Sequence, residues 1–304
     1  MILEVKKINK SFSGNQILND VTFTVTSGKA MGFLGRNGAG KTTTIRTLMD
    51  VFKPDSGNFV LDGKTFKPSD YRVGYLPEER GLYGKEKILD QLIYFGTLRG
   101  ASRNDAKTSA EYWIERFDLS YAKNHKLDTL SKGNQQKIQI AQSLLNDPEI
   151  IILDEPFSGL DPVNAQVLKD VITELIKKDK LVIFSSHQMS YVEEFCDEIT
   201  LIDKGKIILS GELKKIKTDL GHKRLRLSVV DMSQIALKDF VDNNIADIQT
   251  SYDEQSLIIE CINNKTKQSL LNDIVNHQID VELFTNYEPS LNDIFVMKVG
   301  KENA

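Results

Sequence analysis

The chain has 304 residues, of which 40% are hydrophobic and 27% charged, and its formal net charge is -4 at pH 7. This composition excludes collagen-like and fully disordered chains, and the length predicts two domains. We expect no nucleic-acid partner, because no overall basic field would attract phosphates. The strongest apolar run, residues 150–153, is far shorter than the roughly 20 residues that a membrane-spanning helix needs.

The first residues of the chain and its two cysteines point to no export signal, disulfide or metal site. Residues 1–7 alternate in polarity like a strand, and they do not predict a secretory signal. Cys196 and Cys261 have the spacing of neither a disulfide framework nor a zinc site, which favours a reducing cytosol. We expect Cys196 to pack in the core from a helix.

The first half of the chain predicts strands and turns followed by a helical block. The dipeptide Asp62-Gly63 lies between two apolar runs and predicts a hairpin within an antiparallel region. From about residue 88 to residue 145 the apolar residues recur with helical spacing, which predicts a helical segment.

Two apolar runs predict strands of a parallel sheet. Residues 150–153 and 181–184 are apolar throughout and mostly β-branched or aliphatic, which suits strands buried on both faces. The helix between them begins at Asp161, a candidate N-cap, with Pro162 in its first position. A second hairpin turns at residues 203–205.

After residue 222 the pattern predicts a small α+β domain with the order βαββαβ and a closing helix, preceded by a charged linker helix. The expected strands are 225–230, 248–252, 257–262 and 281–284, and the expected helices are 212–217, 235–241 and 266–275.

The sequence GRNGAGKT at residues 35–42 satisfies the phosphate-loop pattern and stands between a predicted strand and a predicted helix. Glycines let consecutive backbone amides wrap a phosphate, Lys41 adds a positive charge, and the Thr42 hydroxyl suits Mg²⁺. We expect the phosphate site to contain Gly35, Asn37, Gly38, Ala39, Gly40, Lys41, Thr42 and Thr43.

Two carboxylates follow the apolar strand at 150–153. Neighbouring side chains on a strand point to opposite faces, so Asp154 and Glu155 have different roles only if the chain turns there, which Pro156 favours. We expect Asp154 to hold Mg²⁺ and Glu155 to polarise the attacking water.

These motifs, with LSKGNQQK at 130–137, SGLD at 158–161 and SSH at 185–187, resemble in order and spacing the ATP-binding cassette (ABC) ATPases. The resemblance covers about residues 1–215. It implies an α/β P-loop nucleotide-binding domain there, with a RecA-like core, an antiparallel β subdomain and a helical subdomain at about 84–148. Residues 216–304 would then form the accessory α+β, ferredoxin-like domain.

The resemblance also implies roles for single residues around ATP and Mg²⁺. Phe12 matches the aromatic residue that stacks on adenine, His187 the switch histidine at the γ-phosphate, and Glu78 stands where most cassettes carry a glutamine that contacts Mg²⁺. Without the family match, Phe12 would be read as a core residue. Glu78 could instead face the membrane subunit.

A second chain completes the site in such cassettes. The signature would act across a head-to-tail dimer formed on ATP binding, and Ser131 would otherwise be an ordinary helix N-cap. Asn134 replaces the usual glutamine of the signature. The implied trans and D-loop contacts are Ser131, Gly133, Asn134 and Asp161.

Three further features resemble the sodium-exporter and drug-exporter branch of this family: the run 76–83, Lys132 in the signature, and PSLNDIF at 289–295. The leading hypothesis is an ATP-hydrolysing exporter subunit at the cytoplasmic face of the membrane. It would work as a homodimer or heterodimer with a separate membrane-spanning permease. The alternatives are a soluble regulatory ABC ATPase and a non-catalytic nucleotide sensor, the latter disfavoured by the presence of Glu155.

Overall fold

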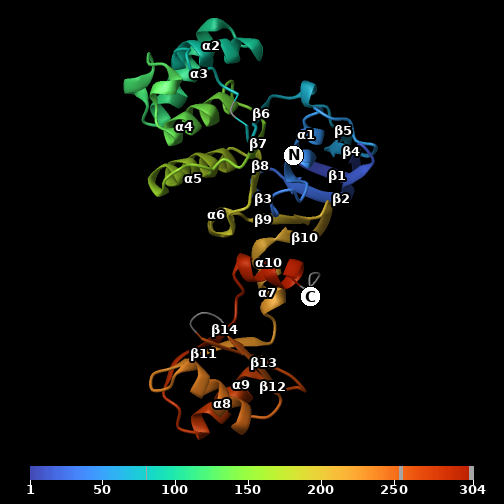
Figure 1. Cartoon of the computed structure of the whole chain (residues 1–304), viewed down its shortest axis with the longest axis vertical. Coiled ribbons are helices and arrows are strands. Elements are labelled where there is room, and N and C mark those ends of the chain that lie inside the picture. Colours follow the sequence, from blue (N-terminus) through green and yellow to red (C-terminus); the bar gives the residue numbers. More distant parts are fainter. Residues whose placement is uncertain (80, 253–255, 301–304) are drawn as a thin grey trace. The chain divides into compact units, whose positions relative to one another are not determined.

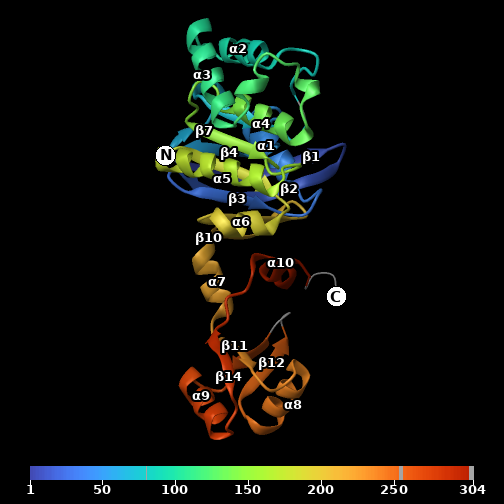
Figure 2. The same cartoon turned by 90° about the vertical axis from the view of Figure 1, so that its left-hand side faces the viewer.

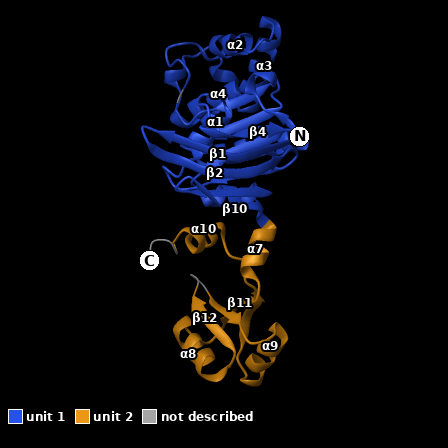
Figure 3. Cartoon of the chain, turned by 90° about the vertical axis from the view of Figure 1, so that its right-hand side faces the viewer, with its two compact units in different colours: residues 1–213 blue, residues 214–304 orange. Residues whose placement is uncertain are grey.

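The computed structural model describes residues 1–79, 81–252 and 256–300, and it divides the chain into two compact units, Met1–Leu213 and Lys214–Ala304 (Figures 1 and 3). Arg80, which belongs to the run 76–83, and residues 301–304 lie outside the described residues. In the described part of the chain, no helix is both long enough and apolar enough to cross a membrane.

The first unit contains an antiparallel sheet with the strand order β2-β1-β4-β5. Its strands are β1 (Ile2–Phe12), β2 (Asn15–Thr26), β4 (Ser56–Leu61) and β5 (Lys64–Thr65). Leu61 pairs with Lys64, so Asp62 and Gly63 form the predicted hairpin turn. Buried and exposed residues alternate along the second half of β2, as expected for a sheet with one face in the core.

The second sheet of this unit is mostly parallel, with the order β10-β9-β3-β8-β7-β6. Its strands are β3 (Ala30–Leu34), β6 (Val73–Leu76), β7 (Ile150–Asp154), β8 (Leu181–Ser186), β9 (Glu198–Asp203) and β10 (Lys206–Glu212). Only β10 runs antiparallel, to β9. Strands β3, β7 and β8 are buried at every position, and for β7 and β8 this confirms the expectation from their continuous apolar runs.

Helices cover both faces of the parallel sheet. Helix α1 (Lys41–Leu48) contacts β2 and β7 and lies between the two sheets, whereas α5 (Pro162–Lys177) and α6 (Met189–Phe195) contact the other face (Figures 1 and 2). The core between the sheets includes the stacked rings of Phe23 and Phe33, whose centroids are 5.2 Å apart. This layering places the start of α1 at the carboxyl end of β3.

Helix α6 approaches the sheet closely because β3 has a glycine beneath it. A Cβ atom added to Gly32 would lie 2.5 Å from Cγ1 of Val192 and 3.1 Å from Sγ of Cys196. Cys196 is buried, and burial raises the pKa of its thiol well above the usual range. Cys196 therefore packs as a small apolar residue, as predicted. The predicted helical position is wrong, because α6 ends at Phe195 and Cys196 follows it with an extended backbone.

A helical segment leaves the parallel sheet after β6 and returns at β7 (Figure 1). It contains α2 (Ile88–Leu98), α3 (Arg103–Arg116) and α4 (Lys132–Ser143), with short 3-10 turns at Ser120–Ala122 and Leu127–Thr129; a third such turn, Pro68–Asp70, precedes β6. The buried indole N–H of Trp113 donates to the Leu144 carbonyl at 3.0 Å, which joins α3 to the end of α4.

The second unit is an α+β sandwich that confirms the predicted order. Its elements are α7 (Leu213–Gly221), β11 (Arg224–Val229), α8 (Gln234–Asn244), β12 (Ile248–Tyr252), β13 (Leu257–Cys261), α9 (Lys267–Asn276), β14 (Val281–Asn286) and α10 (Leu291–Val299). The antiparallel sheet has the order β12-β13-β11-β14, with α8 and α9 packed on one face (Figure 2). Ser290 and Asp293 form a capping box at the start of α10.

The close approach at Gly32 generates a stability prediction. We expect Gly32→Ala to lower the free energy of unfolding by about 1–3 kcal/mol, because the added methyl group overpacks the contact with Val192. Thermal denaturation of the variant measures the loss as a lower Tm. Gly81→Ala is the matched control, since among the described residues, its chain neighbours aside, no atom lies within 4 Å of a Cβ added there. Equal Tm values for the two variants would contradict the packing argument.

Candidate active site

The phosphate loop connects β3 to α1, and its glycines are required by conformation and space. Gly38 and Gly40 have φ values of 79° and 112°, which favour glycine. A Cβ atom on Gly35 would lie 2.4 Å from the carbonyl oxygen of Ile202. The loop therefore exposes its backbone amides at the N-terminus of α1, where an anion is stabilised.

Lys41 is buried, with an exposed fraction of 6%, in the first turn of α1. Its Nζ donates a hydrogen bond to the Gly35 carbonyl at 2.8 Å and lies 3.5 Å from Oε1 of Glu155. The lysine charge thus lies between the loop backbone and a carboxylate that comes from another strand.

The chain turns sharply where β7 ends, between Asp154, its last residue, and Glu155. Glu155 has a φ of 53°, an uncommon value for a residue with a side chain. Ser185 in β8 stabilises this turn, since its hydroxyl donates to Oδ1 of Asp154 and accepts the Glu155 N–H at 3.0 Å. The predicted turn is present, and Ser185 holds both of its residues.

His187 completes the polar cluster from the segment after β8. Its Nδ1 lies 2.9 Å from Oε2 of Glu155, whose other oxygen faces Lys41. Both Glu155 and Lys41 are buried, whereas the His187 side chain is 45% exposed. A carboxylate held in this way can accept a proton from a water molecule or orient it for attack.

Oxygen atoms suited to Mg²⁺ converge beside the loop. Oδ2 of Asp154 is buried and has no hydrogen-bond partner in the described part of the chain, and the Thr42 hydroxyl donates to Oε2 of Glu78 at 3.4 Å. Burial raises the pKa of the Asp154 carboxyl, although the hydrogen bond from Ser185 acts to lower it. Mg²⁺ prefers such a hard oxygen set, so these residues fit the ion. Within residues 1–79, 81–252 and 256–300, no three or more His, Cys, Asp and Glu residues group together as metal ligands.

A cavity of about 520 Å³ lies over these groups. It is lined by Phe12, Ile17, Asn37, Gly38, Gly40, Lys41, Thr42, Thr43, Glu78 and Glu155. Most of the residues expected to bind nucleotide are therefore brought together, with Gly35 and Ala39 in the loop itself. Sequence reasoning missed Ile17, since nothing in the sequence of β2 distinguishes it from a core residue.

The signature residues do not line this cavity. Ser131 caps α4 by accepting the Asn134 N–H at 3.4 Å, and the Asn134 side chain reaches the Tyr121 hydroxyl at 3.3 Å. A Cβ on Gly133 would lie 3.4 Å from the Gly159 carbonyl, and Asp161 caps α5. The signature and the 158–161 segment thus adjoin each other, apart from the phosphate loop.

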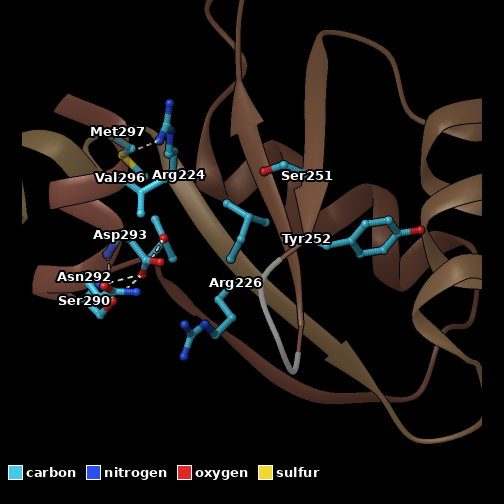
Figure 4. A pocket seen from close by; sticks show the side chains of 11 residues that line it. Arg224, Arg226, Ser251, Tyr252, Ser290, Asn292, Asp293, Val296 and Met297 are labelled. Atoms are coloured by element: carbon cyan, nitrogen blue, oxygen red, sulfur yellow. Dashed lines mark hydrogen bonds between the residues drawn. The ribbon is translucent and has the colours of Figure 1, made fainter. Parts of the chain in front are cut away.

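A second cavity, of about 670 Å³, lies in the second unit between α10 and the sheet face away from α8 and α9 (Figure 4). Arg224 and Arg226 of β11 face it from the sheet, and Val296 and Met297 face it from α10. Nη1 of Arg224 lies 3.9 Å from the Met297 sulfur, and the Arg226 guanidinium is 5.7 Å from the centre of the Tyr287 ring. Sequence reasoning missed this cavity, because it depends on the placement of α10.

Comparison with known proteins agrees with this geometry. A family model described as ABC transporter matches residues 18–158, and a model of the DrrA1-3-like ATP-binding protein C-terminal domain matches residues 211–299. The uncharacterised ABC transporter ATP-binding protein YhaQ of Bacillus subtilis is 36% identical over 303 residues, which cover 98% of this chain and 99% of that protein. The chain belongs to the family of ABC transporter ATP-binding proteins.

Two further relatives extend the comparison. The linearmycin resistance ATP-binding protein LnrL of Bacillus subtilis is 29% identical, over 99% of each chain. A solved structure of the ATP-binding subunit of an ABC transporter is 27% identical with a TM-score of 0.67, over 80% of this chain and 100% of that one. As an ABC transporter ATP-binding protein, the chain binds ATP and hydrolyses it for a transporter.

Ser185 offers a direct test of the turn that separates Asp154 from Glu155 in this ABC subunit. We expect Ser185→Ala to lower kcat for ATP hydrolysis about tenfold or more with little change in KM, because the turn loses the hydroxyl that bonds both residues. Steady-state ATPase assays measure both constants. Ser143→Ala is the control, since that buried hydroxyl donates to the Ile140 carbonyl of its own helix. Equal kcat values in the two variants would refute the role of Ser185.

Proposed function

We propose that the protein is the ATPase subunit of an ABC exporter, which powers transport through a separate membrane-spanning permease. The subunit acts at the cytoplasmic face of the membrane and dimerises head to tail when it binds ATP. The observation that carries the proposal is the buried carboxylate of Glu155, held between Lys41 and His187 at the edge of the phosphate-loop cavity.

In this proposal the three residues of the cluster divide the chemistry. Glu155 orients the attacking water and accepts its proton, and His187 holds the carboxylate and contacts the γ-phosphate. Lys41 leaves Glu155 and the Gly35 carbonyl to bind the phosphates, together with the amides of the loop. The proton of the attacking water therefore passes to the Glu155 carboxylate, whose charge Lys41 no longer neutralises.

Mg²⁺ would be held by Thr42, Asp154 and Glu78. Support comes from the Asp154 oxygen that has no hydrogen-bond partner among the described residues and from the contact of Thr42 with Glu78. The ion would neutralise charge that develops on the phosphate oxygens. A glutamate in place of an amide adds one negative charge to this set, which favours a divalent cation.

The base of the nucleotide would stack on Phe12. Phe12 is 39% exposed and lines the same cavity as Lys41 and Thr42, so base and phosphates can be bound together. Stacking on an aromatic ring contributes about 1–3 kcal/mol for any base. This contact therefore strengthens nucleotide binding, whereas the phosphate loop determines where the γ-phosphate lies.

The signature would serve a partner chain. Ser131, Gly133 and Asn134 do not line the cavity that contains Lys41, but they present the N-terminus of the 12-residue helix α4. A helix N-terminus of this kind stabilises the γ-phosphate of a nucleotide bound to another subunit. Asp161 lies next to this group, in the segment adjoining Gly133.

Export, in the branch that handles sodium or drugs, is supported by the second unit. The DrrA1-3-like domain model covers residues 211–299, and the linearmycin resistance ATP-binding protein LnrL matches this chain over 99% of its length. The run 76–83, Lys132 and the PSLNDIF segment resemble the same branch. The permease supplies the pathway and chooses the substrate.

Replacing the general base tests the proposed chemistry. We expect Glu155→Gln to bind ATP normally but to hydrolyse it about 10²- to 10⁴-fold more slowly, because the amide keeps the shape and cannot accept the proton. ATPase assays and size-exclusion chromatography in ATP measure the loss and the accumulation of a dimer. A variant with near-normal turnover would show that Glu155 is not the base.

Mixing two inactive variants tests whether the site is shared. Lys41→Ala and Ser131→Arg should each be inactive alone, yet a mixture should recover part of the ATPase activity. In the mixed dimer, one composite site keeps both Lys41 and Ser131, whereas the other site loses both. The measurement is ATPase activity at concentrations that permit dimers. A mixture as inactive as its parents would place Ser131 outside the partner's site.

A further inference from the structure

Phe12 is anchored by the segment that follows the phosphate-loop helix. Helix α1 ends at Leu48, and the chain reaches Asp55 just before β4. The Asp55 carboxylate accepts the Ser11 N–H at 2.6 Å with one oxygen and the Lys10 ammonium at 3.0 Å with the other. One side chain therefore holds both residues that directly precede Phe12.

The ring of Phe12 has two neighbours from the same region. Phe52 meets it edge-on, with centroids 5.1 Å apart and an interplanar angle of 78°. Nζ of Lys10 lies 5.3 Å from the ring centre and also donates to the Lys53 carbonyl at 2.7 Å. Because Phe12 remains 39% exposed, these contacts rather than burial determine the position of its ring.

The Asp55 carboxylate is stabilised in its ionised form by the groups that it contacts. The hydrogen bond from Lys10, together with that from the Ser11 N–H, lowers the pKa of Asp55, because both donors stabilise the ionised carboxylate. The backbone N–H of Asp55 donates in turn to the Asn9 carbonyl at 2.8 Å, which closes the connection to β1. Exposed ion pairs contribute little to global stability, so the effect of this one is local.

We propose that Asp55 is a positioning residue that holds Phe12 for stacking on the base of ATP and ties the base subsite to the end of the phosphate-loop helix. The inference rests on the proposed function, in which Phe12 contacts adenine. Asp55 touches neither the base nor the phosphates in this account. It acts through Ser11 and Lys10, and its loss frees the ring while the phosphate loop stays intact.

The test compares a nucleotide with a probe that has no base. In the full chain, Asp55→Ala should raise KM for ATP about fivefold or more, with kcat at saturating ATP within about twofold of wild type. The inhibition constant of tripolyphosphate, which occupies only the phosphate subsite, should not change. Asp55→Asn, which keeps an oxygen for the Ser11 N–H, should raise KM less.

A matched control separates this effect from a general loosening of the sheet. Asp62 also accepts a backbone N–H from β1, that of Ile2 at 2.7 Å, but it lies at the hairpin turn between β4 and β5. Asp62→Asn should leave KM for ATP unchanged. A rise in KM equal to that of Asp55→Asn would overturn the proposal.

Phe12→Ala separates the positioning role of Asp55 from the contact of Phe12 with adenine. If Asp55 acts through the ring, the double variant Asp55→Ala/Phe12→Ala should have the KM of Phe12→Ala alone, and additive effects would overturn the proposal. A tripolyphosphate inhibition constant that rises in parallel with KM would also overturn it. If Phe12→Ala raises KM and Asp55→Ala does not, positioning by Asp55 fails alone. If Phe12→Ala has no effect, the adenine contact of the proposed function fails as well.

Discussion

The polar cluster depends on the register of three parallel strands. Asp154 pairs with Ser185 between β7 and β8, and Leu34 pairs with Ser186 between β3 and β8, so the three strands end at the same level. Gly35, Glu155 and His187 each follow directly after one of these strands. A slip of two residues would move one of the three by about 7 Å along the sheet and separate it from the other two.

Bringing these residues together buries two charges, and the desolvation cost is offset by contacts within the cluster. Lys41 and Glu155 are both buried, and a buried charge without a partner is strongly destabilising. Here the lysine has the Gly35 carbonyl and Glu155, the glutamate has Lys41 and His187, and Ser185 bonds the backbone beneath them. The apolar strands can therefore end in a polar cluster that leaves neither of these two buried charges without a partner.

Sequence alone predicts the parts of the site that are local in the chain. The phosphate loop, the buried strands, the helix after Asp161 and the order of the second unit follow from short patterns, and the structure confirms these elements. The left-handed conformation of Glu155, the hydroxyl of Ser185 and the carboxylate of Asp55 were not predicted. Their contacts join residues 30 or more positions apart, and a serine or aspartate in isolation has no pattern that identifies its partner. The action of the signature on a second chain stays a prediction.

The pairing of Lys41 with Glu155 has a consequence for ligand choice. The loop presents a lysine whose charge is already partly balanced, so an incoming anion must compete with an internal carboxylate for it. A weakly charged anion recovers little by displacing Glu155, whereas a chain of phosphates also contacts the loop amides and the helix N-terminus. The resting ion pair therefore raises the interaction energy that an anion must supply to reach Lys41, which favours a chain of phosphates over a small anion.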